Sequence, residues 1–255
     1  MNTPRPSRLL ASSLLGLAIC LFLASARLRG LLFNSTLLTA GTLAVSLPLG
    51  TLLATLIVKT SLPGRKLIEG VMLALLFIPL YVHAAAWQAA LGHGGWLNPK
   101  NSPIWFTGWT ACIWVHGFAA TAWVVLFVAT ALRNIRPELE EESLQDASPA
   151  RVLRRVSLRG ALAGILAAAL WIAVICFGEI AVTDLYQVRT FAEEIYTAAN
   201  LGVLADSMNV VPAGELTLEN VPQLNFFDLW IGTGVVLALV LAALSAISST
   251  LEISL

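Results

Sequence analysis

The sequence predicts an all-α integral membrane protein, and composition and hydropathy carry that prediction. Of the 255 residues 58% are hydrophobic and only 12% are charged, whereas a soluble domain carries about 25% charged residues. A helix needs about 20 apolar residues to cross a bilayer core of about 30 Å. Backbone polar groups cannot stay unpaired in lipid, so each apolar segment is expected to be helical. About six transmembrane helices in one domain, 1–255, are predicted, at 9–26, 36–58, 67–91, 108–132, 160–186 and 227–248.

The first apolar segment has two interpretations. Arg5 and Arg8 precede a run that ends in Leu23-Ala24-Ser25-Ala26, which is also the pattern of a cleaved signal peptide. A retained first helix is favoured, because the next hydrophobic segment follows at once.

Two prolines lie inside the second and third segments. Pro48 and Pro79 each remove a backbone donor and crowd the preceding turn, so both predict a kink. A helix bundle tolerates such kinks in a membrane.

Basic residues predict the orientation, because lysine and arginine in short loops favour the cytoplasmic side. A cytoplasmic N-terminus places most of them inside: Arg5, Arg8, Lys59, Arg65, Lys66, Arg133, Arg136, Arg151, Arg154, Arg155 and Arg159. The outside then holds Arg27, Arg29, Lys100 and Arg189. The last loop, 187–226, is long, acidic and external. We therefore expect a multi-pass protein of the cell (inner) membrane, surrounded by lipid, with both termini cytoplasmic.

A charged segment, 137–157, separates the fourth and fifth apolar segments. Acidic residues follow Pro137, where the dipole of a short helix favours them. Ser148 and Pro149 are a good N-cap and first residue for a second short helix. Two short helices that meet near 145–147 are predicted on the inner surface. A solvated loop whose arginines only anchor the topology is the alternative.

The order of residues in this segment resembles the cytoplasmic coupling loop of binding-protein-dependent ABC permeases. The matching positions are Glu140, Ala147, Ser148, Pro149, Arg151, Val152, Arg154, Arg155, Val156 and Leu158. Asp146 stands where that family usually has glycine, and Glu141 and Glu142 replace two alanines. The resemblance implies the ABC importer permease (MetI-like) fold, with ATPase coupling through Glu140, Ala147, Ser148, Pro149, Arg151 and Arg154.

Two flanking segments are similar to ferric-iron-type permeases, namely Gly178-Glu179 and 190–196. The resemblance implies a permease subunit that pairs with a second permease half, as a homo- or heterodimer. ABC ATPase subunits and a periplasmic or extracellular solute-binding protein would be its partners. Ferric iron leads as the solute, with molybdate, sulfate and thiamine as alternatives. Nothing in the net charge of zero indicates nucleic acid as a partner.

An enzyme is not predicted. The chain contains no G-x-x-x-x-G-K-[ST] motif, so it cannot hydrolyse ATP by a P-loop mechanism, and energy must come from a partner. The H-E-x-x-H zinc-protease motif is also absent. An ion-coupled secondary transporter is the rival class, and it predicts transport without ATPase subunits.

Ionisable residues inside the apolar segments are candidates for a translocation path. Glu179 is costly at membrane depth, so it is expected to face a cavity or a partner. His83 and His116 lie in the third and fourth segments. With suitable geometry the three can form a transient metal site, and structural hydrogen bonding between helices is the alternative. The cysteines lack metal-site spacing, and no cofactor or resident metal is predicted.

Overall fold

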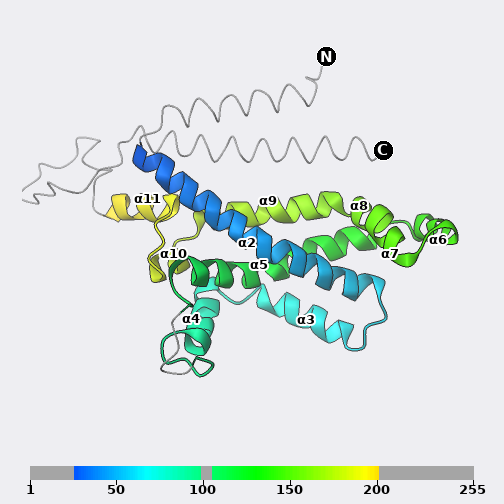
Figure 1. The fold of residues 1–255 in the computed structure, drawn as a ribbon, viewed down its shortest axis with the longest axis horizontal. Coiled ribbons are helices and arrows are strands. Elements are labelled where there is room, and N and C mark those ends of the chain that lie inside the picture. The colour runs from blue at the N-terminus through cyan, green and yellow to red at the C-terminus, as the bar shows by residue number, and fades with distance from the viewer. Residues whose placement is uncertain (1–25, 99–104, 201–255) are drawn as a thin grey trace, which may run out of the picture.

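The chain is all-helical in the residues that the structure describes, which are 26–98 and 105–200 of a computed structural model; no strand occurs there (Figure 1). Two helices, α2 (Ala26–Lys59) and α5 (Gly108–Arg133), are each long and apolar enough to cross a membrane. Two bent helix pairs raise that number to four if each pair is one span. The predicted segment 9–26, except for its last residue, and the predicted segment 227–248 lie outside the described residues.

The centre of the fold is the packing of α5 against α2 and against α9 (Leu162–Gly178). Small residues allow α2 and α5 to approach closely. A Cβ atom on Gly50 would lie 2.4 Å from Val124 Cβ, and one on Gly117 would lie 2.8 Å from Val45 Cβ. Helices in membranes associate through such close contacts, because lipid supplies no hydrophobic force between them.

The third apolar segment forms two helices rather than one. α3 (Arg65–Leu75) and α4 (Leu80–Leu91) are bent by 109° at a break that ends at Pro79. The kink predicted there is confirmed, and it is sharp enough to interrupt the helix. Pro48, in contrast, lies inside α2, which continues through it unbroken. The loss of one backbone donor at the exposed Pro48 does not stop that helix.

The fifth apolar segment, predicted as a single helix over 160–186, is also divided. α9 ends at Gly178, Glu179 is extended, and α10 (Ala181–Leu185) begins two residues later. The Glu179 carboxylate accepts a hydrogen bond from the Val182 N–H at 2.9 Å, so the side chain satisfies a donor in the first turn of α10. Hydropathy cannot predict this break, since the flanking residues are apolar.

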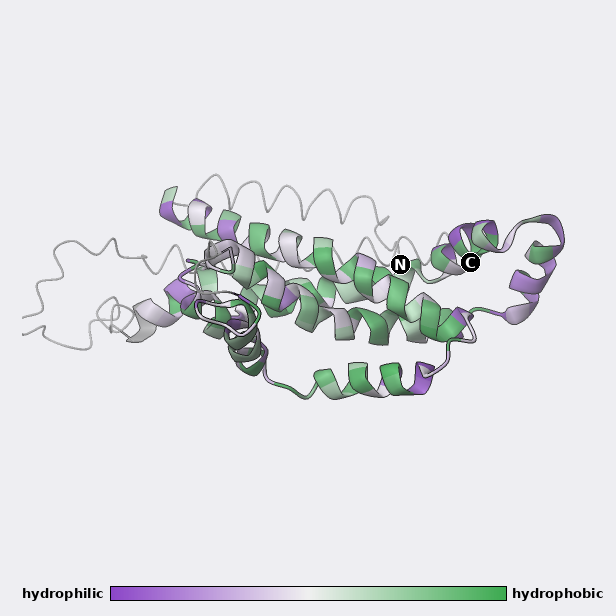
Figure 2. Cartoon of the chain, turned by 60° about the horizontal axis from the view of Figure 1, so that its bottom comes forward, coloured by the Kyte–Doolittle hydropathy of each residue, from purple (hydrophilic) through white to green (hydrophobic). Residues whose placement is uncertain are grey.

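The charged segment forms the two short helices predicted for it, α6 (Pro137–Asp146) and α7 (Pro149–Val152). A π-helical turn, η1 (Leu153–Ser157), and α8 (Leu158–Gly160) lead from α7 into α9. Asp146 stays helical and Ala147 is extended, so the turn needs no left-handed residue. We call residues 137–157 the hairpin. Figure 2 shows it as a hydrophilic projection from one end of the apolar bundle.

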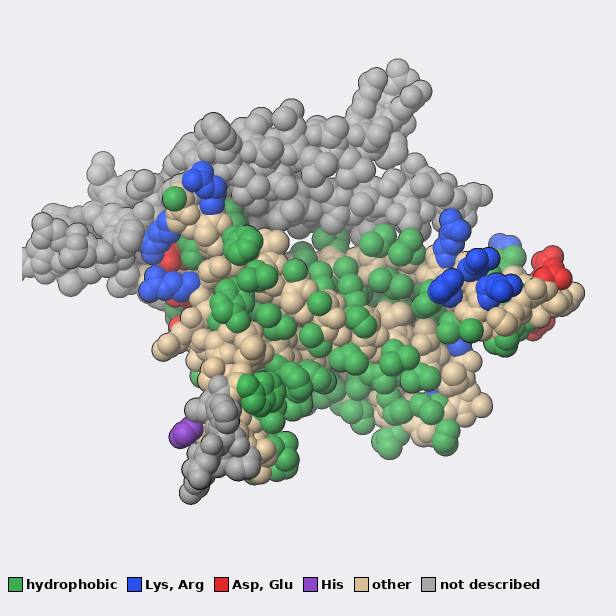
Figure 3. Space-filling view, viewed as in Figure 1, with side chains coloured by type: hydrophobic (Ala, Val, Ile, Leu, Met, Phe, Trp, Pro, Cys, Tyr) green, Lys and Arg blue, Asp and Glu red, His purple; other side chains and the backbone are tan. Residues whose placement is uncertain are grey.

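The opposite end carries α11 (Phe191–Asn200), which is held against α2. Arg27 forms an ion pair with Glu194. Ser35 Oγ accepts a hydrogen bond from the Phe191 N–H at 3.0 Å, and Asn34 donates one to the Arg189 carbonyl at 2.9 Å. Charged side chains thus gather at both ends of a molecule whose middle is apolar (Figure 3).

Candidate functional site

The hairpin presents an exposed surface of apolar and charged side chains. No residue of α6 is buried, and Leu139 and Leu144 are 52% and 47% exposed. Exposed charges surround them: Glu138, Glu141 and Glu142 on α6, and Arg151, Arg154 and Arg155 after the turn. Apolar side chains with a charged rim, outside the apolar bundle, are typical of a protein-docking surface.

Glu140 is the only acidic residue of the hairpin that is partly buried, whereas the others are exposed. Its carboxylate lies 2.8 Å from Lys59 Nζ, at the end of α2, and accepts a hydrogen bond of 2.5 Å from the Ser157 hydroxyl. Burial alone raises the pKa of this carboxyl, but the bonds from Lys59 and Ser157 outweigh burial and leave the pKa below its ordinary value. Glu140 therefore fastens the hairpin to α2.

The predicted coupling residues separate into two groups. Ser148, Pro149, Arg151 and Arg154 are exposed, and Ala147 is half-buried. All five lie at or just after the turn, where a partner can approach. Glu140 differs from them, because its carboxylate is engaged within the chain. Ser148 is the N-cap of α7 and Pro149 its first residue, as predicted, although no side-chain hydrogen bond completes the cap.

Inside the bundle the structure brings together His116 and Glu179. His116 Nε2 lies 3.2 Å from Glu179 Oε2, and the two side chains are 2% and 11% exposed. His116 Nδ1 lies 2.8 Å from the carbonyl oxygen of Cys112, one turn earlier in α5. The pair thus joins α5 to the break between α9 and α10.

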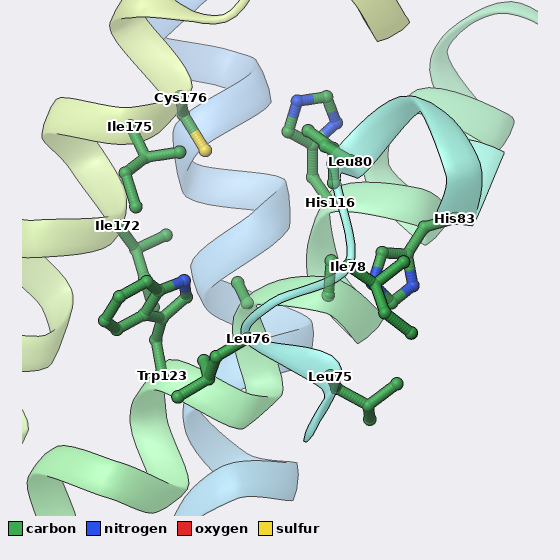
Figure 4. A pocket seen from close by; sticks show the side chains of 12 residues that line it. Leu75, Leu76, Ile78, Leu80, His83, His116, Trp123, Ile172, Ile175 and Cys176 are labelled. Carbon is green, nitrogen blue, oxygen red and sulfur yellow. The ribbon is translucent and has the colours of Figure 1, made fainter. Parts of the chain in front are cut away.

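His83, the third residue predicted for a path, lies beside a cavity of about 160 Å³ that His116 also lines. The cavity lies between α4, α5 and α9, with apolar walls that include Leu76, Trp123 and Ile172 (Figure 4). No group of three or more His, Cys, Asp or Glu side chains in the described part of the chain is placed to hold a metal ion. The geometry thus supports a polar pair beside a cavity.

Three residues of these sites carry no signal in the sequence. Lys59 ends an apolar helix and looks like a topology anchor, Ser157 is one serine among many, and Cys112 contributes a backbone carbonyl. Lys59 and Ser157 contact Glu140 from other elements of the fold, so only the packing of the folded chain reveals these contacts. The contact of the Cys112 carbonyl with His116 lies within α5, but no side-chain pattern marks a backbone carbonyl as a partner.

These features define the class of protein: over residues 26–98 and 105–200 the chain is all-helical, with two to four helices able to cross a membrane. No protein-family model matches the chain, and no curated protein matches it in sequence.

Proposed function

We propose that the chain is the permease subunit of an ATP-driven ABC importer. The hairpin is the observation that carries this proposal. It projects from one end of an apolar bundle, exposes Leu139 and Leu144 between charged residues, and keeps the order of residues that resembles an ABC coupling loop. Two leucines exposed among charged residues, outside the apolar bundle, are available to a docking partner.

The distribution of charge supports a cytoplasmic hairpin. Lys59 ends α2, Arg65 begins α3 and Arg133 ends α5, and these helix ends lie at the same end of the bundle as the hairpin (Figure 1). Lysine and arginine concentrate on the cytoplasmic side of membrane proteins. In the proposed topology six spans cross the cell (inner) membrane. Both termini then lie on the cytoplasmic side, and the acidic loop 187–226 lies outside.

Energy would reach the bundle through the hairpin. The chain has no P-loop, so in the proposed importer an ATPase subunit supplies the work. The ion pair of Glu140 with Lys59 attaches the hairpin to α2, the longest described helix, and the hydrogen bond from Ser157 fixes the Glu140 carboxylate within the hairpin. A displacement of α6 by a docked ATPase would therefore move α2 as well. A second permease half, identical or different, would complete the path, and a solute-binding protein would deliver the solute from outside.

The solute path is proposed to pass the interior polar residues Glu179, His83 and His116. Ferric iron is the leading solute, with molybdate, sulfate and thiamine as alternatives. Because the described residues hold no preformed metal cluster, a metal would be passed on through transient contacts.

An ion-coupled secondary transporter is the second candidate, and the broken helices favour it. Such transporters bind substrate and ion where discontinuous helices expose their ends at membrane depth. α9 stops at Glu179 beside His116, and α3 and α4 are bent by 109°. The two candidates differ in their source of energy.

Reconstituted uptake separates the two. The chain, purified with its associated subunits, is placed in vesicles, and uptake of candidate solutes is measured with internal or external ATP and with an imposed proton or sodium gradient. Uptake that requires ATP and survives collapse of the gradients supports the importer. Gradient-driven uptake by the chain alone, without any ATPase, would replace it with the secondary transporter.

A further inference from the structure

The hydrogen-bond geometry around His116 fixes where its protons lie. A carbonyl oxygen can only accept, so the Nδ1 atom that lies 2.8 Å from the Cys112 carbonyl carries a proton. In a neutral imidazole the other nitrogen, Nε2, then holds a lone pair. That lone pair would face the Glu179 oxygen at 3.2 Å.

Two lone pairs cannot be held at that distance without a proton between them. Either His116 is an imidazolium that donates to a carboxylate, or Glu179 is protonated and donates to a neutral imidazole. Both arrangements contain the same number of protons and have no net charge. Neither Nε2 nor Oε2 has a hydrogen-bond partner in the described part of the chain, and the two atoms face each other only through the 3.2 Å contact. The contact therefore depends on a single shared proton.

A cavity adjoins His116, although Nε2 and Oε2 are themselves buried and Glu179 is not among the residues that line it. The cavity of about 160 Å³ is large enough for more than one water molecule, and it is lined by both His116 and the half-buried His83. The titratable groups near the pair or the cavity are Cys112 of α5, Cys176 of α9 and His83 of α4. Tyr186, after α10, interacts with Cys112. α2 contributes no charged residue between Arg29 and Lys59.

We propose that His116 and Glu179 form a proton-binding site at the break between α9 and α10, reached from the surface through the cavity beside His83. The proton comes from water and binds between Nε2 and Oε2. Its loss leaves a carboxylate facing an imidazole lone pair, so the contact between α5 and the break opens. Glu179 Oε1 meanwhile still caps α10 through Val182, and α10 would move with it. This inference holds for either transporter class.

Histidine-selective nitrogen-15 labelling tests the site, because the chain has only three histidines, His83, His93 and His116. The full chain is studied in lipid nanodiscs, and His83→Gln and His93→Gln assign the signals. His116 should show a protonated Nδ1 throughout. In Glu179→Gln its affinity for a proton at Nε2 should fall by at least about tenfold, since the acid that shares the proton is gone. Glu179→Asp, which retains an acid, should recover part of the affinity.

The exposed His93 serves as the internal control and should titrate identically in every variant. A second variant tests the route: Ala119→Leu narrows the cavity and should slow deuterium exchange at His116 by at least about tenfold while leaving its proton affinity unchanged. The proposal is overturned if His116 titrates alike in the wild type and in Glu179→Gln, or if Ala119→Leu leaves its exchange rate unchanged.

Discussion

Lys59 Nζ lies 2.8 Å from Glu140 Oε2, and this contact joins the end of α2 to a hairpin that follows it by 81 residues along the chain. The Ser157 hydroxyl donates to the other carboxylate oxygen. Glu140, which lies on α6, thus connects α6 both to η1, through Ser157, and to the end of α2, through Lys59. A displacement of α6 would be passed to α2 through this contact.

Removing the carboxylate charge should loosen the hairpin. Glu140→Gln weakens charge-assisted bonds to Lys59 and Ser157, each side chain of the ion pair being about one-fifth exposed, so the local cost should be about 1–2 kcal/mol. Trypsin should then cut after Arg151 or Arg154 roughly five to thirty times faster. Glu142→Gln, which changes an exposed acid on the same helix, is the matched control. Equal cleavage rates of the two variants would show that the Glu140 contacts do not stabilise the attachment of the hairpin.

The attachment of the hairpin should also depend on pH. The folded pKa of Glu140 lies below its ordinary value, so its contribution to stability is complete above the unfolded pKa of about 4.3. That contribution is lost as the pH falls through the lowered folded pKa. Proteolysis with an acid-active protease should therefore rise in the wild type only below about pH 4, and Glu140→Gln should lack this step. A step at the same pH in the variant would assign it to another group.

The close approach of α2 and α5 predicts which glycines are irreplaceable. A side chain at Gly50 would collide with Val124, whose Cβ lies 2.4 Å from the position of an added Cβ, so Gly50→Val should cost about 1–3 kcal/mol. Gly30→Ala lies on the same helix with nothing within 4 Å and should be neutral or slightly stabilising. Thermal unfolding in detergent measures both. Similar midpoints for the two variants would contradict the packing.

Orientation can be tested with residues at the two ends of the bundle. In a chain whose natural cysteines are replaced, Gln145→Cys on the hairpin should resist a membrane-impermeant maleimide applied to intact cells. Gln187→Cys, exposed at the other end, should react. Permeabilisation should make the hairpin cysteine reactive. The opposite pattern would place the hairpin outside and remove the basis for ATPase docking.

Sequence reasoning predicts well what depends on neighbouring residues. The all-helical character follows from hydropathy, the break at Pro79 from its missing donor, and the start of α7 from Ser148 followed by Pro149. These features are local, because each is decided within one turn of helix. The two helices of the hairpin were predictable for the same reason.

Contacts between distant segments were not predictable. Glu140 looks like one of several acids in a helix, and only folding brings Lys59 to it. Glu179 was expected to have a partner at membrane depth and was considered together with His83 and His116. The structure pairs it with His116, but the apolar sequence around it gives no sign that α9 ends just before it or that it bonds to the first turn of α10. Pro48 lies inside α2, which continues through it.

The proposed function rests on a surface that an ATPase can recognise at the turn of the hairpin. Ala147→Trp places a large ring at a half-buried position in this turn and should prevent close approach there. Because residues outside the bundle core do not hold the helices together, the amount of protein in the membrane should stay normal. Ala147→Ser is the matched control, because serine is close to alanine in size, and this variant should behave as the wild type.

The most direct test is to isolate the affinity-tagged chain from its native membranes and identify the bound subunits by native mass measurement. Two permease halves with two P-loop ATPases are expected for the wild type and for Ala147→Ser. For Ala147→Trp at matched expression, ATPase association should be reduced by a hundredfold or more, as expected for a loss of at least about 3 kcal/mol. Wild-type chain that supports uptake without any bound ATPase, or full ATPase binding by Ala147→Trp, would contradict the account.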